Sequence, residues 1–134
     1  MKPETEDYIA KARECLDAAI KIQSLCLPQV AAKEAYLAAY HAAQAFVFER
    51  NGKVVKSHGG MRTQFALLAK DDPRIDRTLA ALLGRAYKFK EVADYAVGSQ
   101  AAVTLTEAQG VIDIAQNFVD TIVGLLPPVS ATEP

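Results

Sequence analysis

The stretch KEAYLAAYHAAQAF, residues Lys33–Phe46, predicts an alanine-rich helix that carries two tyrosines and one of the chain's two histidines. Tyr36 and Tyr40 are four residues apart and share one helix face, and Leu37 and His41 share the neighbouring face. The small alanines between them allow a second helix to approach closely. Two interpretations are open from the residues alone: the tyrosines and His41 are packed in a core, or they form part of a binding site.

Helical periodicity continues on both sides of this stretch. The helix that contains it is expected over Pro28–Arg50, with Gly52 free to take a left-handed conformation just after its end. An earlier helix is expected to open at Pro3 or Thr5 and to end near the segment CLPQV, because Pro28 disfavours helix at the residue before it.

Three further helices are expected downstream. Ser57 is a candidate N-cap for a short helix through MRTQFALLAK, and Asp72 is a candidate N-cap for the next, with Pro73 at its first position and its end near Gly98. The last helix follows TLTE, a capping-box pattern. These elements predict an all-α fold, an up-and-down four-helix bundle with an additional short helix, over residues 1–126, followed by a disordered tail at 127–134.

Composition excludes several classes of function. With 15 basic and 16 acidic residues the formal charge is −1, which gives no overall electrostatic footprint for nucleic acid or an anionic membrane. The one local basic patch noted in the sequence is Arg50, Lys53 and Lys56. No apolar run reaches the roughly 18 residues of a membrane span, and the polar start MKPETEDY is not a signal peptide. We therefore expect a soluble cytoplasmic protein.

The two cysteines are not expected to pair. Cys15 and Cys26 would lie about 16 Å apart along one helix, too far for a disulfide. Both are expected to be buried, in a reducing compartment. The histidines and cysteines show no metal-ligand spacing, and no nucleophile motif is present, so neither a metal, a cofactor nor a catalytic residue is assigned.

Two polar segments are candidates for binding. KSHGG, residues 56–60, precedes a helix whose free N–H groups would suit an anion, or it is only a cap and turn. In KEVADY, Lys90 and Asp94 are spaced to pair on the surface. We expect His41, His58 and Asp94 to converge on one cleft, where the carboxylate would raise a histidine pKa. The alternative is that each is used separately.

Three segments in order, AYLAAYHAAQAF, KSHGG and VADY, resemble the HEPN superfamily (higher eukaryotes and prokaryotes nucleotide-binding). The similar branch has small stand-alone proteins with an A-Y-Y-A-x-F-H-A-A-x-A helix, a K-T-H-S-G loop and an R-x-x-A-D-Y ending. The opening PETEDYIAKARECLDAA is similar to the first helix of that branch, and the resemblance runs from about Glu4 to Asn117.

The resemblance implies an all-α bundle that is usually a homodimer and is often encoded beside a minimal nucleotidyltransferase. The wide apolar faces expected on the second and fifth helices also indicate surplus hydrophobic surface, as a dimer would need. Carried over by position, the candidate ligand-binding residues are Tyr36, His41, Lys56, Ser57, His58, Lys90, Asp94 and Tyr95.

The sequence departs from the family pattern at four positions. Leu37 replaces a tyrosine, Tyr40 a phenylalanine, Glu34 a common arginine, and Lys90 the arginine of the last motif. Lysine lacks the bidentate fork of arginine. Many HEPN toxins cleave RNA with an arginine followed by four to six residues and a histidine; here seven residues separate Arg50 from His58, so the motif is absent.

The expected function is a dimeric HEPN binding module that acts with a nucleotidyltransferase partner or a nucleotide-related ligand, in a toxin–antitoxin-like pair. Two alternatives stay open. One is an RNA-cleaving enzyme with a non-standard site built from His41, His58 and Asp94, in which histidine supplies acid–base chemistry. The other is an interaction bundle without a ligand.

Overall fold

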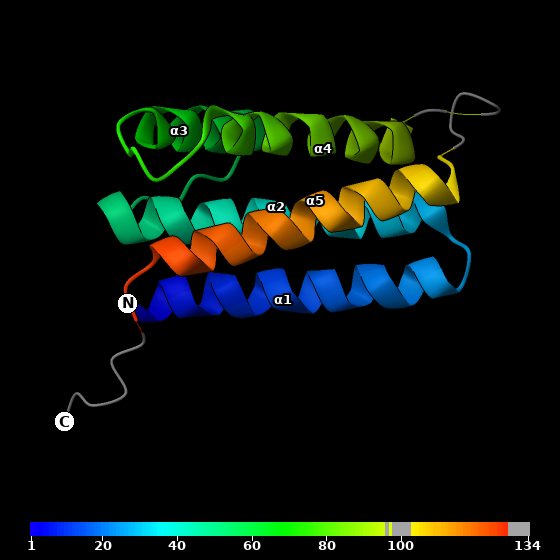
Figure 1. Cartoon of the computed structure of the whole chain (residues 1–134), viewed down its shortest axis with the longest axis horizontal. Coiled ribbons are helices and arrows are strands. Elements are labelled where there is room, and N and C mark those ends of the chain that lie inside the picture. Colours follow the sequence, from blue (N-terminus) through cyan, green and yellow to red (C-terminus); the bar gives the residue numbers. More distant parts are fainter. Residues whose placement is uncertain (96, 98–102, 129–134) are drawn as a thin grey trace.

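A computed structural model describes residues 1–95, 97 and 103–128, and within these ranges the chain is all-α. The helices are α1 (Pro3–Ser24), α2 (Pro28–Asn51), α3 (His58–Lys70), α4 (Arg77–Tyr95) and α5 (Leu105–Leu125). They form three layers in Figure 1, with α1 below, α2 and α5 in the middle, and α3 and α4 above. The predicted all-α bundle is confirmed. The division into residues 1–126 and a tail stays a prediction, since 129–134 lie outside the described residues.

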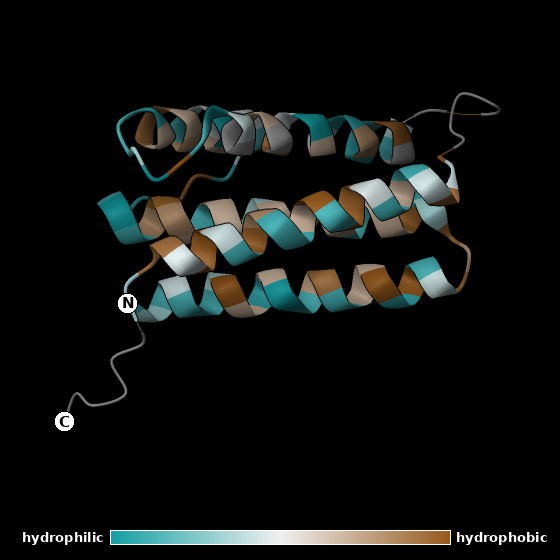
Figure 2. Cartoon of the chain, in the orientation of Figure 1, coloured by the Kyte–Doolittle hydropathy of each residue, from teal (hydrophilic) through white to brown (hydrophobic). Residues whose placement is uncertain are grey.

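The central element is α2, which packs against all four other helices. Eight of its twelve buried residues are alanines, so neighbouring helices approach its backbone closely. The larger side chains fill the gaps between them: Tyr36, Phe46 and Val47 are fully buried. In contrast, α1 and α5 each bury one stripe, and Figure 2 shows hydrophobic and hydrophilic residues interleaved along both. No helix in the described part of the chain has the combined length and apolarity needed to cross a membrane.

Local sequence signals set most helix ends. Pro28 opens α2, and Gly52 closes it in the left-handed conformation, with its N–H donating to the Phe48 carbonyl at 2.8 Å. Ser57 caps α3 by accepting from the Gly60 N–H at 2.9 Å. The capping box between Thr104 and Glu107 is formed in both directions. These expectations from the sequence are confirmed.

The predicted start of α4 is wrong. The helix begins at Arg77 instead of Pro73, because the Asp72 carboxylate faces arginines and not the free N–H groups of a helix. Asp72 is buried and accepts from Arg50 as well as from the backbone and guanidinium of Arg74. Asp76, placed directly before the helix, accepts from the Thr78 N–H at 3.1 Å in the capping role.

Two other expectations concern the burial of the cysteines and the end of α4. Cys15 is buried, but Cys26 is exposed in the turn after α1, in the left-handed conformation at φ +59°, so the expectation that both cysteines are buried is wrong. Both thiols are free. The described part of α4 ends at Tyr95, and the end expected near Gly98 lies outside the described residues.

We expect Asp72→Asn to lower the free energy of unfolding by about 1–3 kcal/mol at pH 7, because it weakens charge-assisted hydrogen bonds that join α2 to the turn before α4. Urea denaturation measures this, with the exposed neighbour Asp71→Asn as the control.

The same ion cluster makes the effect depend on pH. Hydrogen bonds from Arg74 hold the pKa of Asp72 well below its usual range. The stabilisation is therefore present above the unfolded pKa of about 3.9 and is lost as the pH falls below that value. The gap between wild type and Asp72→Asn should shrink in acid; an equal gap at pH 3 and pH 7 would contradict this account.

Candidate functional site

Four aromatic rings from three helices form the aromatic cluster: Tyr36 and Tyr40 of α2, His58 of α3 and Tyr87 of α4. The two tyrosines share a face because they lie one turn apart on α2. The Ser57 cap starts α3 at His58 and so places that imidazole over them. Ring centroids are 4.4 Å apart for Tyr40 and His58, and 5.4 Å for Tyr36 and Tyr87. The cluster therefore fixes the relative positions of α2, α3 and α4.

A short hydrogen bond links two of these rings. The Tyr36 hydroxyl lies 2.7 Å from Nδ1 of His58. Burial raises the pKa of Tyr36 far above its usual value, so the phenol keeps its proton and donates it. Burial first, then the nearby cations of Lys90 and Arg62, lower the pKa of His58, against the opposing effect of Asp94. His58 is thus neutral near pH 7, with its own proton on Nε2.

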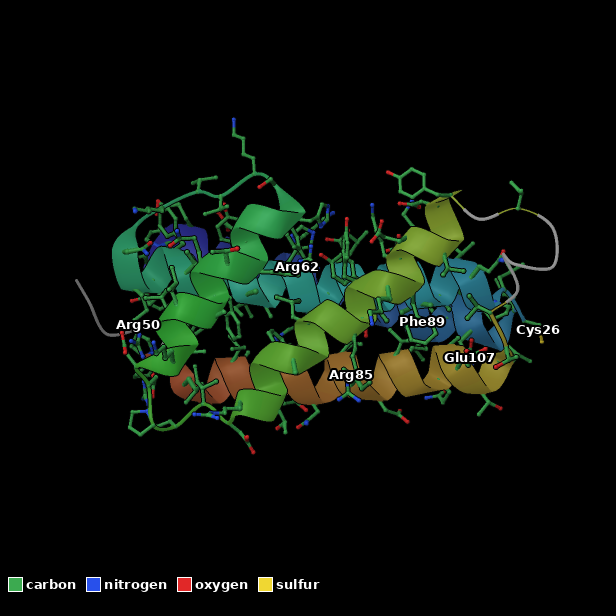
Figure 3. The ribbon with its side chains drawn as sticks, turned by 90° about the horizontal axis from the view of Figure 1, so that it is seen from above. Cys26, Arg50, Arg62, Arg85, Phe89 and Glu107 are labelled. Carbon is green, nitrogen blue, oxygen red and sulfur yellow. The ribbon has the colours of Figure 1, made fainter. Side chains whose placement is uncertain are left out.

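Cations surround the aromatic cluster. The Arg62 guanidinium lies over the Tyr87 ring, 4.1 Å from its centroid, and Figure 3 shows Arg62 in the space between α3 and α4. The Lys90 ammonium lies 6.0 Å from the centroid of the Tyr87 ring and 5.7 Å from that of Tyr95. These contacts give the cluster a positive rim.

Asp94 is bound by lysines. Its carboxylate is 2.7 Å from Lys90 Nζ and 2.9 Å from Lys33 Nζ, and these contacts lower the pKa of Asp94, Lys90 first. The Lys90 and Asp94 side chains are only 13% and 17% exposed, so the pair is largely buried and not the solvated surface pair expected from the sequence. Among the described residues Asp94 is therefore ion-paired with lysines and not with a histidine, and although its charge acts to raise the pKa of His58, burial and the nearby cations lower that pKa overall, so the expected rise is not found.

The remaining candidates are dispersed around the cluster. His41 packs its ring against the edge of Tyr40, at 5.6 Å, but its Nδ1 lies 2.7 Å from Oε1 of Gln44, within the same helix. Lys56 is exposed, Ser57 is occupied as the α3 cap, and Tyr95 is 73% exposed at the far end of α4. Tyr36, His58, Lys90, Asp94 and Tyr95 form one connected group, whereas His41 contributes only a ring edge.

Three further residues that contact this group were not identified from the sequence: Lys33, Arg62 and Tyr87. Lys33 and Arg62 had a usable signal, since Lys33 is three residues before Tyr36 on α2 and Arg62 is four residues after His58 on α3. Tyr87 had one too, because it precedes Lys90 by one turn. Arg62 and Tyr87 lie outside the three motifs of the resemblance, and Lys33 belongs to the stretch Lys33–Phe46 but precedes the motif AYLAAYHAAQAF.

Comparisons with known proteins agree on the fold. Residues 5–126 match the model of the HEPN domain. "Putative toxin MJ0605" of Methanocaldococcus jannaschii is 29% identical over 122 residues, which are 91% of this chain and 88% of that protein. The crystal structure of TT1696 from Thermus thermophilus has a TM-score of 0.77 at 22% identity and covers 93% of this chain and 100% of that one.

We expect His58 to titrate below its ordinary pKa, and Arg62→Gln to raise that pKa because one of the neighbouring cations is removed. The imidazole proton shifts in NMR spectra report the titration. Since a depressed histidine pKa means that the unfolded state binds the proton better, His58 should also reduce stability as the pH falls through this range. The control for Arg62→Gln in the His58 titration is Lys70→Gln, which removes an exposed cation at the end of α3. A His58 pKa above 6.5 would contradict the assignment of a buried, cation-flanked ring.

Proposed function

Because this chain belongs to the HEPN domain family, we propose that it is a binding module for a nucleotide-related ligand. We also propose that the chain is a homodimer in the cytoplasm and acts with a nucleotidyltransferase partner in a toxin–antitoxin-like pair. The observation that carries the ligand proposal is the positive rim of the aromatic cluster, where Arg62 and Lys90 lie against tyrosine rings. The word toxin in the name of the Methanocaldococcus jannaschii relative supports the pair.

The phosphate and the base of a nucleotide each have a counterpart among the residues around the aromatic cluster. Phosphate oxygens suit the guanidinium of Arg62 and the ammonium of Lys90, which already faces two rings and a carboxylate. A base needs an exposed π-face, and Tyr95 supplies one next to Lys90. Arg62 Nε is also buried without a hydrogen-bond partner among the described residues. A bound phosphate oxygen that accepted from Nε would therefore remove the free-energy cost of burying an unpaired donor.

We expect ATP and AMP to bind to the pure protein, measured by titration calorimetry. Arg62→Gln and Lys90→Met should each weaken binding roughly tenfold, since each removes one charged contact to phosphate. Lys21→Met is the control, because Lys21 is an exposed lysine on α1, away from the cluster.

Two results would count against this proposal. Equal affinity in Arg62→Gln, Lys90→Met and Lys21→Met would separate nucleotide binding from the cluster. Cleavage of mixed RNA that is lost in His41→Ala or His58→Ala would favour the ribonuclease alternative, for which the neutral imidazole of His58 is the supporting observation.

The dimer proposal needs a different surface from the one that the sequence indicated. The apolar faces of α2 and α5 are used inside the protomer, where they form most of the core. Exposed apolar side chains instead gather at the end of the bundle where α1 meets α2 and α5 begins. They are Leu25, Leu27, Val30 and Leu105, with a hollow of about 150 Å³ lined in part by Leu27, Val30 and Val103. The Gln23 amide donates to the Leu105 carbonyl at 2.8 Å and holds the two segments together.

We expect light scattering to give a dimer mass for the wild type and a monomer mass for Leu27→Glu, because a buried carboxylate without a partner would disfavour association. Leu67→Glu is the control: Leu67 on α3 is 56% exposed, compared with 50% for Leu27, and lies outside the surface in question. A wild-type monomer at high micromolar concentration would refute the dimer.

A further inference from the structure

The charges of this nearly neutral chain are strongly segregated. Residues 50–90 hold ten of the 15 basic residues and only three of the 16 acidic residues, a formal charge of +7, whereas the rest of the chain carries −8. Three of these cations, Arg50, Lys53 and Lys56, precede α3; α3 and α4 themselves, which form the upper layer in Figure 1, hold six basic and two acidic residues, a formal charge of +4. The small net charge of the whole chain therefore conceals one basic layer on an otherwise acidic protein.

Within this layer, α4 presents one outward stripe that combines three cations with apolar groups. At 100° per residue its members fall within a sector of about 80° and extend over about 27 Å. Every member is exposed or half-buried, while Leu83 and Ala86 on the opposite side are buried. We call it the α4 stripe; it consists of Arg77, Ala81, Arg85, Lys88, Val92 and Tyr95.

Two shallow hollows lie along the α4 stripe. One, of about 370 Å³, is lined by Arg85, Lys88, Phe89 and Val92. The other, of about 400 Å³, is lined by Lys88, Glu91, Val92 and Tyr95. They share Lys88 and Val92, so together they form a continuous apolar track with cations beside it. Figure 3 shows Arg85 and Phe89 on this part of α4.

The cations of the α4 stripe have one acidic neighbour on this surface, Glu91, which lines a hollow together with Lys88. Among the described residues, Arg77, Arg85 and Lys88 take part in no ion pair, whereas Lys90 on the other side of α4 is paired with Asp94. Arg85 and Lys88 are three residues apart and repel each other. Arg77 also lies in the first turn of α4, where the helix dipole disfavours a cation. An anionic partner would relieve each of these contacts.

We propose that the α4 stripe is the docking site for an acidic amphipathic helix of a partner protein. Aliphatic side chains at helical spacing fill the two hollows around Val92, and flanking glutamates or aspartates pair with Arg77, Arg85 and Lys88. The inference deepens the partner part of the proposed function by stating the partner's chemistry. It does not depend on nucleotide binding: the aromatic cluster lies on the other face of α4, Tyr95 is the one stripe residue that also borders the proposed ligand site, and no variant in the test below changes it.

The apolar lining favours a protein helix over nucleic acid. Interfaces with nucleic acid are strongly polar and positively charged, whereas these hollows are lined in part by Phe89 and Val92, and one of them is also lined by the acidic residue Glu91. A base could stack on Phe89, but Val92 offers no π-face. A second copy of this chain is also disfavoured on this face in a two-fold dimer, since equivalent basic layers would face each other.

The test uses a fluorescent designed peptide, helical, with leucines along one face and glutamates on both flanks. A permuted peptide of the same composition but without the apolar face is the probe control. Binding to the full chain is followed by anisotropy. Lys88→Glu and Arg85→Glu should each weaken binding of the designed peptide at least tenfold, and Val92→Ser should weaken it also at high salt, where charge contributes less.

The matched control variant is Lys70→Glu, the same charge reversal on an exposed lysine of the basic layer, outside the α4 stripe. It should change the affinity less than threefold. Circular dichroism confirms that each variant is folded, and ATP binding retained in Lys88→Glu keeps this test separate from that of the nucleotide site.

Three outcomes would overturn the proposal. The first is that the designed peptide does not bind, or binds no better than the permuted one. The second is that Lys70→Glu costs as much affinity as Lys88→Glu, which would mean diffuse attraction to the layer as a whole. The third is that a single-stranded RNA oligonucleotide binds more tightly than the designed peptide and that Lys88→Glu and Arg85→Glu abolish this RNA binding. The α4 stripe would then be a nucleic-acid surface.

Discussion

The burial of α2 is the constraint on which the rest of the molecule depends. A helix surrounded by four others must keep its side chains small wherever a neighbour crosses it, and α2 does so with eight buried alanines. The few large side chains of α2 then determine how α3 and α4 pack against it. Tyr36 and Tyr40 fill the space under α3 and α4, and the hydroxyl of Tyr36 finds its partner in His58. The candidate site is thus a consequence of how the core is packed.

Polar contacts lock the upper layer onto this core at both ends. At one end Asp72 joins Arg50 of α2 to Arg74 in the turn before α4. At the other end Asp94 of α4 joins Lys33 of α2 to Lys90 of α4. Buried or half-buried carboxylates of this kind cost free energy unless they are fully paired. Because each has two cationic partners, α4 is held at both its beginning and its end.

The two faces of α4 have different chemistry. The inner face carries Tyr87, Lys90 and Asp94, whose charges are paired or lie against rings. The outer face carries Arg85 and Lys88 beside exposed apolar surface. The helix α4 therefore lies between most of the proposed ligand site and the proposed partner surface, and Tyr95 borders both.

The sequence by itself determined the helices, because their ends depend on contacts between near neighbours. Ser57, Gly52, Pro28 and the box of Thr104 and Glu107 act within a few residues, and all four were predictable. The HEPN motifs also predicted several residues of the candidate site, among them Tyr36 and His58. Asp72 was mistaken for a helix cap because one of its two arginine partners, Arg50, lies 22 residues away.

Only the tertiary structure decided which side chains meet. Tyr36 and His58 are also 22 residues apart, and Arg62, Lys33 and Tyr87 joined them only when α2, α3 and α4 were packed together. The same holds for charge: the excess of lysine and arginine in α3 and α4 is visible in the sequence, but it forms one surface only because these two helices share a layer. Helix ends follow from short-range hydrogen bonds, whereas the site follows from which faces are buried, and that depends on every helix at once.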